Sequence, residues 1–248
     1  MKILNAILAH KDFTWDDIPE NLLKQYKVFT PNKINTNIPN VCVFKEVEGY
    51  DNRIYSEFSH LKYIRDNEDF DWIIINHYRR RLLVTDFNNI LIRESIKLLC
   101  SVQKQFEVFH SKEDLDLYTQ IINESDVDED FKIAWKESLD IDLMYVCNMV
   151  SCPKYIFDIV IDLICKIDDE FKKRKNIKTY EDVFKQYKNL YYQKCKFTKD
   201  PFRVIACLSE RLFSAFFYYY TKQLRENKIK GFPLLECDVK LLENKMIM

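Results

Sequence analysis

Residues 71–81 read Asp-Trp-Ile-Ile-Ile-Asn-His-Tyr-Arg-Arg-Arg, and this stretch indicates both the fold class and the place of a binding site. Residues 72–75 form an unbroken apolar run rich in β-branched side chains, which is typical of a strand buried on both faces within an α/β sheet. The run ends in the basic segment 77–81. Ligands of open α/β sheets bind at the carboxyl ends of strands, and guanidinium groups match phosphate or carboxylate oxygens. The stretch therefore predicts an anion-binding site, with a basic solvated turn as the alternative.

The composition describes a globular chain without a general affinity for nucleic acids. The 248 residues are 47% hydrophobic and 15% aromatic, which is enough to build a sizeable core. There are 38 basic and 39 acidic residues, so the formal net charge is -1, whereas a nucleic-acid binder would need a basic surplus. The two glycines, Gly49 and Gly231, cannot form a Gly-x-Gly-x-x-Gly fingerprint or a Walker loop. A Rossmann dehydrogenase and a P-loop kinase are therefore disfavoured.

The cysteines and the apolar segments suggest a cytoplasmic protein. The 8 cysteines include no Cys-x-x-Cys pair, so we expect reduced thiols and no zinc site. Neither a secretory signal nor a stretch of about 20 apolar residues is visible. The aromatic run 216–220 and its basic neighbours leave open a peripheral contact with the inner face of the cytoplasmic membrane, although a core position or an oligomer surface would also suit it.

Hydrophobic periodicity predicts strands and helices in alternation, with helices dominating the C-terminal half. Ser111 is an expected helix cap, and the acidic residues around Asp128 are expected to cap the next helix. The predicted strands are 2–9, 41–44, 72–75, 143–150 and 231–235. The predicted helices are a short one near 18–26, followed by 55–67, 87–100, 115–125, 130–137, 153–173, 180–192 and about 202–223.

Several motifs give the chain a resemblance to a known family. They are Tyr55-Ser56-Glu57-Phe58 with Asn67, then His77-Tyr78-Arg79-Arg80, and later Arg203 with Leu208-Ser209-Glu210-Arg211-Leu212. The chain has Ala206-Cys207 where that family has Gly-Phe. The pattern resembles a bacterial family long labelled a domain of unknown function, whose members occur in capsule, exopolysaccharide and lipopolysaccharide loci and include galactofuranosyltransferases. His10-Lys11 and Asn148-Met149 also match it, so the resemblance covers most of the chain.

This resemblance implies a glycosyltransferase of the GT-A-like, Rossmann-like α/β class. We expect a single domain over residues 1–248, with a mixed central sheet flanked by helices. Residues 1–110 would be the nucleotide-sugar-binding half, and residues 111–248 the helical acceptor half. The donor would be a nucleotide diphosphate sugar, with a UDP-sugar favoured and galactofuranose among the candidate sugars. The acceptor would be a growing surface polysaccharide or a lipid-linked glycan.

Other functions stay open at this stage. One is a non-catalytic subunit that binds a nucleotide sugar or a glycan within a polysaccharide synthesis complex. Another is a module that binds phosphate ligands or nucleic acid through residues 79–81, although the near-neutral net charge disfavours it. The sequence does not decide whether the protein forms oligomers.

The resemblance and the strand-end rule together select the candidate site residues. Glu210 is the expected general base and His77 the second catalytic candidate, while pairing of Glu210 with a neighbouring arginine is its structural alternative. Glu57 is expected to orient an arginine near His77. The nucleotide-sugar-binding candidates are His10, Lys11, Tyr55, Glu57, Tyr78, Arg79, Arg80, Arg203 and Arg211. The acceptor candidates are His110, Asn148 and Met149.

The usual metal-binding motif of GT-A enzymes is not where it would be needed. Such enzymes end an interior strand with Asp-x-Asp, whose carboxylates hold a divalent metal against the diphosphate. Here Asp69-x-Asp71 lies at the opposite end of the predicted strand, and the other Asp-x-Asp pairs follow no buried strand. We therefore hypothesise that Arg79, Arg80 and His77 replace the metal. No cofactor is expected, although a role for Mn or Mg stays open.

Overall fold

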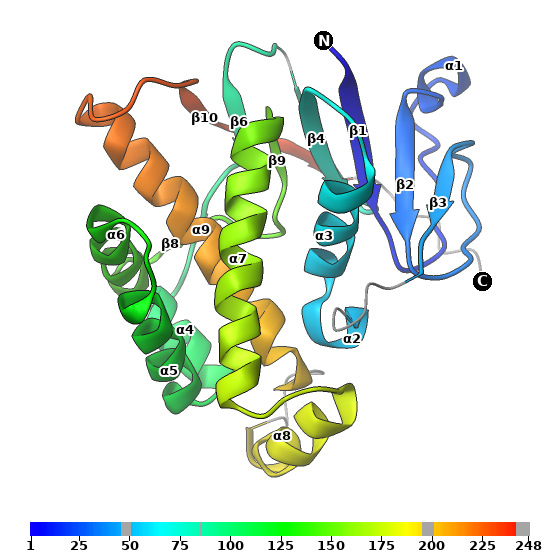
Figure 1. The fold of residues 1–248 in the computed structure, drawn as a ribbon. Coiled ribbons are helices and arrows are strands. Elements are labelled where there is room, and N and C mark those ends of the chain that lie inside the picture. Colours follow the sequence, from blue (N-terminus) through cyan, green and yellow to red (C-terminus); the bar gives the residue numbers. More distant parts are fainter. Residues whose placement is uncertain (46–50, 85, 195–200, 242–248) are drawn as a thin grey trace.

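The computed structural model describes residues 1–45, 51–84, 86–194 and 201–241, which form a mixed β-sheet with helices packed against it (Figure 1). The main sheet runs in the order β10-β6-β9-β4-β1-β2-β3, and a β5–β11 pair joins it at the end of β4. The strands of this sheet are β1 (Ile3–Leu8), β2 (Tyr26–Thr30), β3 (Val41–Val43), β4 (Trp72–His77), β5 (Arg80–Leu82), β6 (Ile90–Arg93), β9 (Val150–Pro153), β10 (Leu234–Cys237) and β11 (Val239–Leu241).

β4 lies at the centre of this sheet, and all six of its residues are buried. It runs parallel to β1 and antiparallel to β9. Because side chains alternate along a strand, Ile73 and Ile75 point into the main core, whereas Trp72 and Ile74 pack in a second cluster on the opposite face. Burial on both faces explains why this segment shows no alternation of apolar and polar residues.

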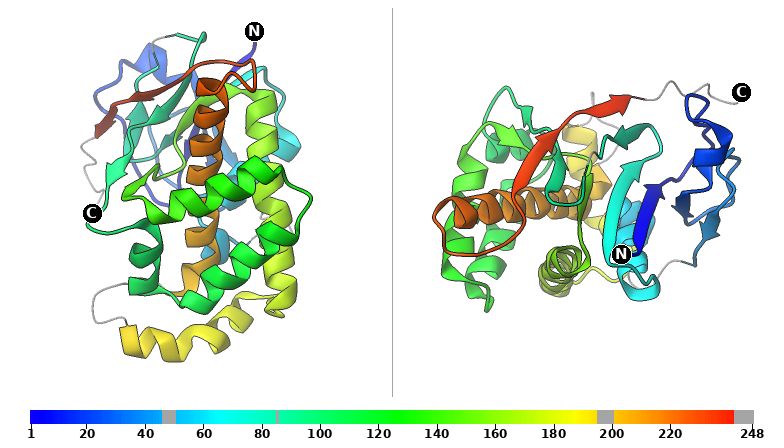
Figure 2. Two further views of the ribbon diagram at one scale, coloured as in Figure 1. Left: turned by 90° about the vertical axis from the view of Figure 1, so that its left-hand side faces the viewer. Right: turned by 90° about the horizontal axis from the view of Figure 1, so that it is seen from above.

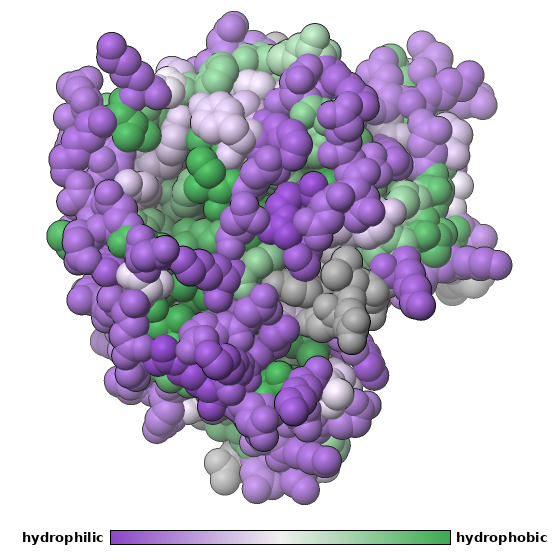
Figure 3. Space-filling view, in the orientation of Figure 1, coloured by the Kyte–Doolittle hydropathy of each residue, from purple (hydrophilic) through white to green (hydrophobic). Residues whose placement is uncertain are grey.

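The helices enclose the main core from one side of the sheet. Helices α3 and α7 cross one face of it, and α5 and α6 lie outside α9 (Figures 1 and 2). In the same orientation, hydrophilic side chains cover most of this surface (Figure 3). The helices are α1 (Glu20–Leu23), α2 (Asn52–Tyr55), α3 (Glu57–Asn67), α4 (Val102–Phe109), α5 (Lys112–Glu124), α6 (Glu129–Asp140), α7 (Lys154–Arg174), α8 (Tyr180–Lys194) and α9 (Val204–Arg225), with a 3-10 turn at Pro201–Arg203.

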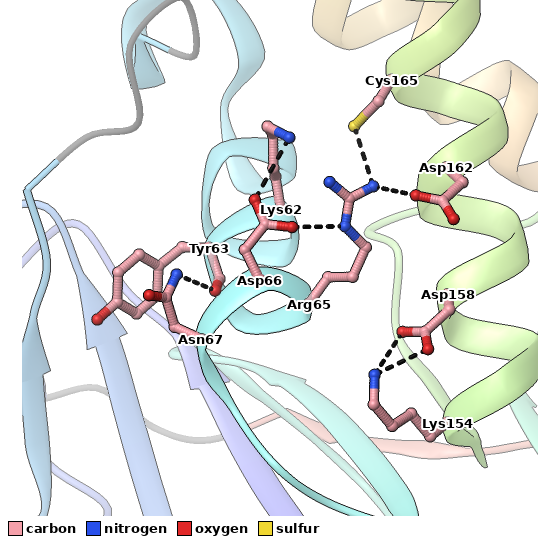
Figure 4. Close-up of polar contacts among 9 residues, drawn as sticks. All are labelled: Lys62, Tyr63, Arg65, Asp66, Asn67, Lys154, Asp158, Asp162 and Cys165. Atoms are coloured by element: carbon pink, nitrogen blue, oxygen red, sulfur yellow. Dashed lines mark hydrogen bonds and ion pairs between the residues drawn. The ribbon is translucent and has the colours of Figure 1, made fainter.

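Polar contacts tie α3 to α7 across the sheet face. Arg65 of α3 pairs with Asp162 of α7, and its Nε also donates to the neighbouring Asp66 at 2.8 Å (Figure 4). Lys154 pairs with Asp158 one turn along α7, at 2.8 Å. Because Asp162 is largely exposed, such a pair contributes at most about 1 kcal/mol, and apolar packing provides most of the stability of this interface.

Helix α9 is buried around most of its circumference, as expected for a helix that packs against both α6 and α7. Phe216, Phe217 and Tyr220 are all buried, so the idea that the aromatic run could rest on a membrane surface is wrong for these three side chains. Within the described ranges, no helix is long and apolar enough to cross a bilayer.

The fold class and most elements agree with the sequence-based predictions, including the caps at Ser111 and Asp128. Two predicted elements are wrong. The segment 87–100 contains β6 and the short β7 (Ile96–Lys97) instead of a helix, because Ile90 to Ile92 is another run buried inside the sheet. The segment 143–150 is not a single strand; β8 (Leu143–Met144) pairs with β7, and the interior strand β9 begins only at Val150.

Within the described residues, the sheet also contains three strands that the sequence did not predict, β2, β5 and β11. It takes β9 and β10 from beyond residue 110, so both predicted halves of the chain contribute strands to it.

Candidate functional site

The carboxyl end of β4 is held firmly against its neighbours. His77 lies opposite Leu8 of β1, and the Tyr78 N–H donates to the Leu8 carbonyl at 3.1 Å. The chain then turns back, so that Arg80 pairs with His77. The buried Asn76 joins three strands, since its amide donates to the Ala6 carbonyl at 3.1 Å and its oxygen accepts from the Leu82 N–H at 2.9 Å. The basic segment therefore projects from a rigid corner of the sheet.

His77 is buried and electrically neutral at ordinary pH. Its Nδ1 accepts the Arg79 N–H at 3.2 Å, which leaves the ring proton on Nε2, 3.7 Å from the Glu57 carboxylate. Burial lowers the pKa of His77 to about 4, and the charges of Arg79 and Arg80 act in the same direction while Glu57 opposes them. His77 can therefore donate a hydrogen bond to a ligand through Nε2–H without carrying a positive charge, and its expected part in holding a diphosphate stays a prediction.

Glu57 owes its position to a break between two helices. Ser56, at φ 52°, lies between α2 and α3 in a conformation that side-chain-bearing residues rarely adopt, and it makes Glu57 the first residue of α3. The Ser56 hydroxyl donates to the Glu57 carboxylate at 2.5 Å. Burial raises the pKa of Glu57, but the Ser56 bond and His77 outweigh it, so the pKa falls below the usual value. Within the described ranges no arginine forms an ion pair with Glu57, whose side-chain neighbour is the Nε2 of neutral His77 at 3.7 Å, so the expectation that Glu57 orients an arginine is not confirmed.

Three arginines lie around the end of β4. Arg79 is exposed, and its guanidinium lies 5.1 Å from the centre of the Tyr78 ring. Arg80 and Arg93 both approach the Cys147 sulfur, at 3.6 and 2.9 Å. Among the residues that the structure describes, no carboxylate forms an ion pair with any of the three, and the Nε of Arg80 is buried without a hydrogen-bond partner. These cations are therefore available to an anionic ligand.

Glu210 approaches the arginines from α9. It lies about two turns inside that helix. Its Oε1 accepts the N–H of Cys147 at 2.8 Å, and Cys147 and Asn148 both have left-handed backbone angles, φ 66° and 50°. Burial raises the pKa of Glu210, and the negative charge of Glu57 adds to this, while the Cys147 N–H opposes it. The pKa of Glu57 is therefore lowered and that of Glu210 is raised, as in sites that use one carboxyl group as an acid and another as a base.

His10 and Arg203 complete the group of residues around the end of β4. The His10 ring lies edge-on to Tyr78, with centroids 5.0 Å apart. Burial lowers the pKa of His10, while the charges of Glu57 and Arg203 also act on it. Lys11 is exposed and follows directly. We call His10, Glu57, His77, Arg79, Arg80, Arg93, Cys147, Arg203 and Glu210 the strand-end cluster.

Four candidates lie away from the cluster or face the interior. Arg211 donates to the carbonyl of Cys207 and to Gln105 of α4, and its guanidinium stacks on Phe106. The His110 ring also packs against Phe106, with ring centroids 4.7 Å apart. Tyr55 is fully buried beneath Lys172, and Met149 packs behind the sheet with Trp72. Consecutive residues of a helix point about 100° apart, and here Arg211 contacts α4 whereas Glu210 contacts Cys147.

Asn148 lies next to Cys147, and its buried side-chain oxygen has no hydrogen-bond partner among the residues that the structure describes. Its predicted role toward a sugar hydroxyl stays a prediction.

Sequence reasoning missed Arg93 and Cys147. Arg93 follows a buried apolar run, Ile90 to Ile92, much as His77 follows the run at 72–75. This similarity in the sequence could have identified Arg93 as a site residue.

The cluster does not fit a divalent metal. Its carboxylates, Glu57 and Glu210, are already engaged by Ser56 and by the N–H of Cys147, and arginines surround them. Hard divalent cations prefer several oxygen ligands, whereas guanidinium groups repel them. Across the described ranges, no group of three or more His, Cys, Asp or Glu side chains is arranged to hold a metal ion.

The sheet, its flanking helices and the cationic strand end define a protein of the GT-A-like α/β class. A solved structure of similar fold is the apo form of the bifunctional glycosyltransferase WbbM, with a TM-score of 0.67 and 14% sequence identity. The similarity covers 98% of this chain but 46% of that protein, so the chain spans less than half of its length.

The sequence comparison defines the family. The domain family described as a domain of unknown function, DUF4422, matches residues 81–223, more than half of the chain, and the protein belongs to it. The matched range includes Arg93, Cys147, Arg203 and Glu210 but begins just after Arg80. No curated protein matches the chain.

Proposed function

We propose that this protein is a glycosyltransferase that binds the diphosphate of a nucleotide sugar at the strand-end cluster. The observation that carries the proposal is the convergence of Arg79, Arg80 and Arg93, none paired with a carboxylate of the described residues, at the carboxyl end of the central strand. This is the edge of an α/β sheet where ligands bind. The shared fold with WbbM supports the same class of reaction.

The arginines would stabilise the leaving group. When the bond between the anomeric carbon and the diphosphate breaks, its electron pair stays with the diphosphate oxygen, and negative charge grows there. Fixed guanidinium groups offset this charge without reorganising, an effect worth about 3 kcal/mol per donor in comparable sites. On this proposal the arginines take the place of a metal ion.

Glu210 would act as the general base. The acceptor hydroxyl passes its proton to the free oxygen of the Glu210 carboxylate while its oxygen bonds to the anomeric carbon, and the nucleoside diphosphate leaves. The other oxygen is held by the Cys147 N–H, and the raised pKa makes the carboxylate a better proton acceptor. Neutral His77 would donate its Nε2–H to the diphosphate or to Glu57.

The finer assignment follows the family resemblance. We propose a UDP-sugar donor, with galactofuranose the first sugar to test, and a surface polysaccharide or lipid-linked glycan as acceptor. The reaction would take place in the cytoplasm, within a single domain over residues 1–248 to which both halves contribute site residues.

A panel of nucleotide sugars tests the proposal directly. The purified chain is incubated in EDTA with each donor, and the released nucleoside diphosphate is measured with and without a mixture of oligosaccharide acceptors. We expect one donor to be consumed, and the Glu210→Gln variant to bind it without consuming it. Binding without turnover in the wild type would favour a non-catalytic binding subunit, and the absence of binding by every donor would overturn the proposal.

A further inference from the structure

A cavity of about 400 Å³ lies along α9, beyond the strand-end cluster. Its floor is the α9 face that carries Ser214, Tyr218 and Arg225, and its walls come from the end of α6, from the β8 segment with Tyr145, and from Glu236 of β10. It is separate from the sheet edge that binds the proposed diphosphate. Nothing in the proposed donor chemistry uses it.

A short segment of chain links the cavity to Glu210. Two hydrogen bonds fix the segment 145–147 along α9: the Cys147 N–H donates to Glu210 at 2.8 Å, and the Tyr145 N–H donates to the Ser214 hydroxyl at 3.0 Å. Ser214 lies one helical turn beyond Glu210, about 6 Å along the axis. The same short segment therefore borders the candidate base at one end and the cavity at the other.

The lining of the cavity suits a saccharide. Tyr145 and Tyr218 line the cavity and are half-buried, and aromatic rings can pack against the apolar faces of sugars. Hydroxyl groups from Ser138, Ser214 and Thr221 lie beside them.

The charged side chains that line the cavity are Lys222 and Arg225 against Glu226 and Glu236, so their charges are balanced in number. Lys222 also pairs with Glu137 at 2.9 Å, and Glu236 accepts a hydrogen bond from Ser95 at 3.1 Å. Arg225 is an exposed cation at the end of the floor, without an ion-pair partner in the described ranges. A balanced, hydroxyl-rich and aromatic lining fits a neutral oligosaccharide better than a second phosphate.

We infer that this cavity is the acceptor subsite, which holds the sugar units next to the one whose hydroxyl faces Glu210. The inference rests on the proposed function for its biological meaning. It predicts on its own, however, that the protein binds oligosaccharides in the cavity whether or not it consumes a donor. Tyr218 is the side chain expected to carry most of the affinity.

The test uses an array of defined oligosaccharides of common hexoses and N-acetylhexosamines, followed by titration of the full chain with the best binder. We expect Tyr218→Ala to weaken binding at least about tenfold, and Tyr218→Phe, which keeps the ring, to bind like the wild type. The matched control is Tyr219→Ala: Tyr219 is the next residue of α9, but it packs against Phe131 with centroids 5.5 Å apart.

UDP binding is measured in parallel on each variant, because it reports the strand-end cluster alone. Loss of oligosaccharide binding in Tyr218→Ala with UDP binding unchanged supports the subsite, even if no donor is ever consumed. Undiminished oligosaccharide binding by Tyr218→Ala, or a wild type that binds no oligosaccharide at millimolar concentration, overturns it. Failure of UDP binding in the wild type would instead contradict the proposed function.

Discussion

At the scale of single residues, Arg79 and Arg80 are the most informative positions. Each lacks a carboxylate partner in the described part of the chain, so replacing it leaves no buried charge behind and should not disturb folding. We expect Arg79→Ala and Arg80→Ala each to lower kcat/KM by about a hundredfold, as loss of one fixed donor does in comparable sites. Steady-state kinetics with the best donor measures this effect.

Arg81 provides the matched control for these variants. It follows directly in β5 but lines a separate cavity with Asn76 and Leu82. Arg81→Ala should therefore keep nearly the wild-type activity. If all three variants lost activity to the same extent, the effect would come from the β4–β5 turn as a whole, and the clamp would be contradicted.

The pH dependence of the reaction should report Glu210. Its carboxylate must be ionised to accept a proton, and burial raises its pKa above the ordinary value of 4.5. In a plot of kcat/KM against pH, the acidic limb should therefore lie above pH 4.5, and activity should be lost as the pH falls through this limb. Glu57→Gln removes a negative charge that raises this pKa, so the limb should move to lower pH. A limb that stays in place would show that another group titrates.

Part of this site could be predicted from sequence. The end of the run at 72–75 identified His77, Arg79 and Arg80, because a buried strand must stop where its charged residues begin. The meeting of Arg93, Cys147 and Glu210 could not be predicted, since it depends on the order β6-β9-β4 across the sheet. Nor does a sequence pattern indicate left-handed backbone at a cysteine and an asparagine.

At the scale of elements, the Ser209–Leu212 motif of α9 serves several parts of the fold at once. Ser209 donates to Asp168 of α7 at 2.7 Å, Glu210 faces the strand-end cluster, and Arg211 packs on α4. Leu212 is buried in the main core. A helix displays successive residues in different directions, so one short motif can link α9 to three neighbours.

Asp168 makes the stability of this helix pair depend on pH. It is fully buried, and burial raises its pKa to about 7 even though Tyr118 and Ser209 both donate hydrogen bonds to it. The unfolded chain ionises this group near pH 3.8, so the native state holds the extra proton between these values. Its contribution to stability is therefore complete below about pH 3.8 and is lost as the pH rises through 7.

Urea unfolding at pH 5 and pH 8 checks this prediction. The Asp168 contribution to the free energy of unfolding should fall by on the order of 2 kcal/mol between the two. Asp168→Asn keeps the shape without the charge, so its stability should change less with pH and exceed that of the wild type at pH 8. Equal pH dependence in both proteins would contradict the buried, protonated carboxyl.

Helices and strands could be predicted where the sequence shows a single clear hydrophobic pattern. The helices α3, α7 and α8 came from clear amphipathic patterns, and β4 from its unbroken apolar run. The run at 90–92 carries the same strand signal as β4, yet the prediction placed a helix over 87–100. The predicted strand 143–150 failed at Cys147 and Asn148, where the left-handed angles interrupt an otherwise apolar segment.

At the scale of the whole molecule, α9 connects the two proposed ligand sites. Its first half contributes Glu210 to the strand-end cluster, and its second half forms the floor of the cavity. Because α9 is buried against α6 and α7, donor and acceptor would be held in a fixed relation with little conformational cost. The arrangement places the two substrates at opposite ends of the short segment 145–147.

The most direct test of the central claim is calorimetric titration of UDP into the wild type and into Arg80→Ala, each in EDTA and again with added Mn. We predict that the wild type binds UDP equally well in EDTA and in Mn, and that Arg80→Ala binds it at least about tenfold more weakly under both conditions. Binding that disappears in EDTA and returns with Mn, or that is unaffected by the loss of Arg80, would contradict an arginine clamp that acts without a metal.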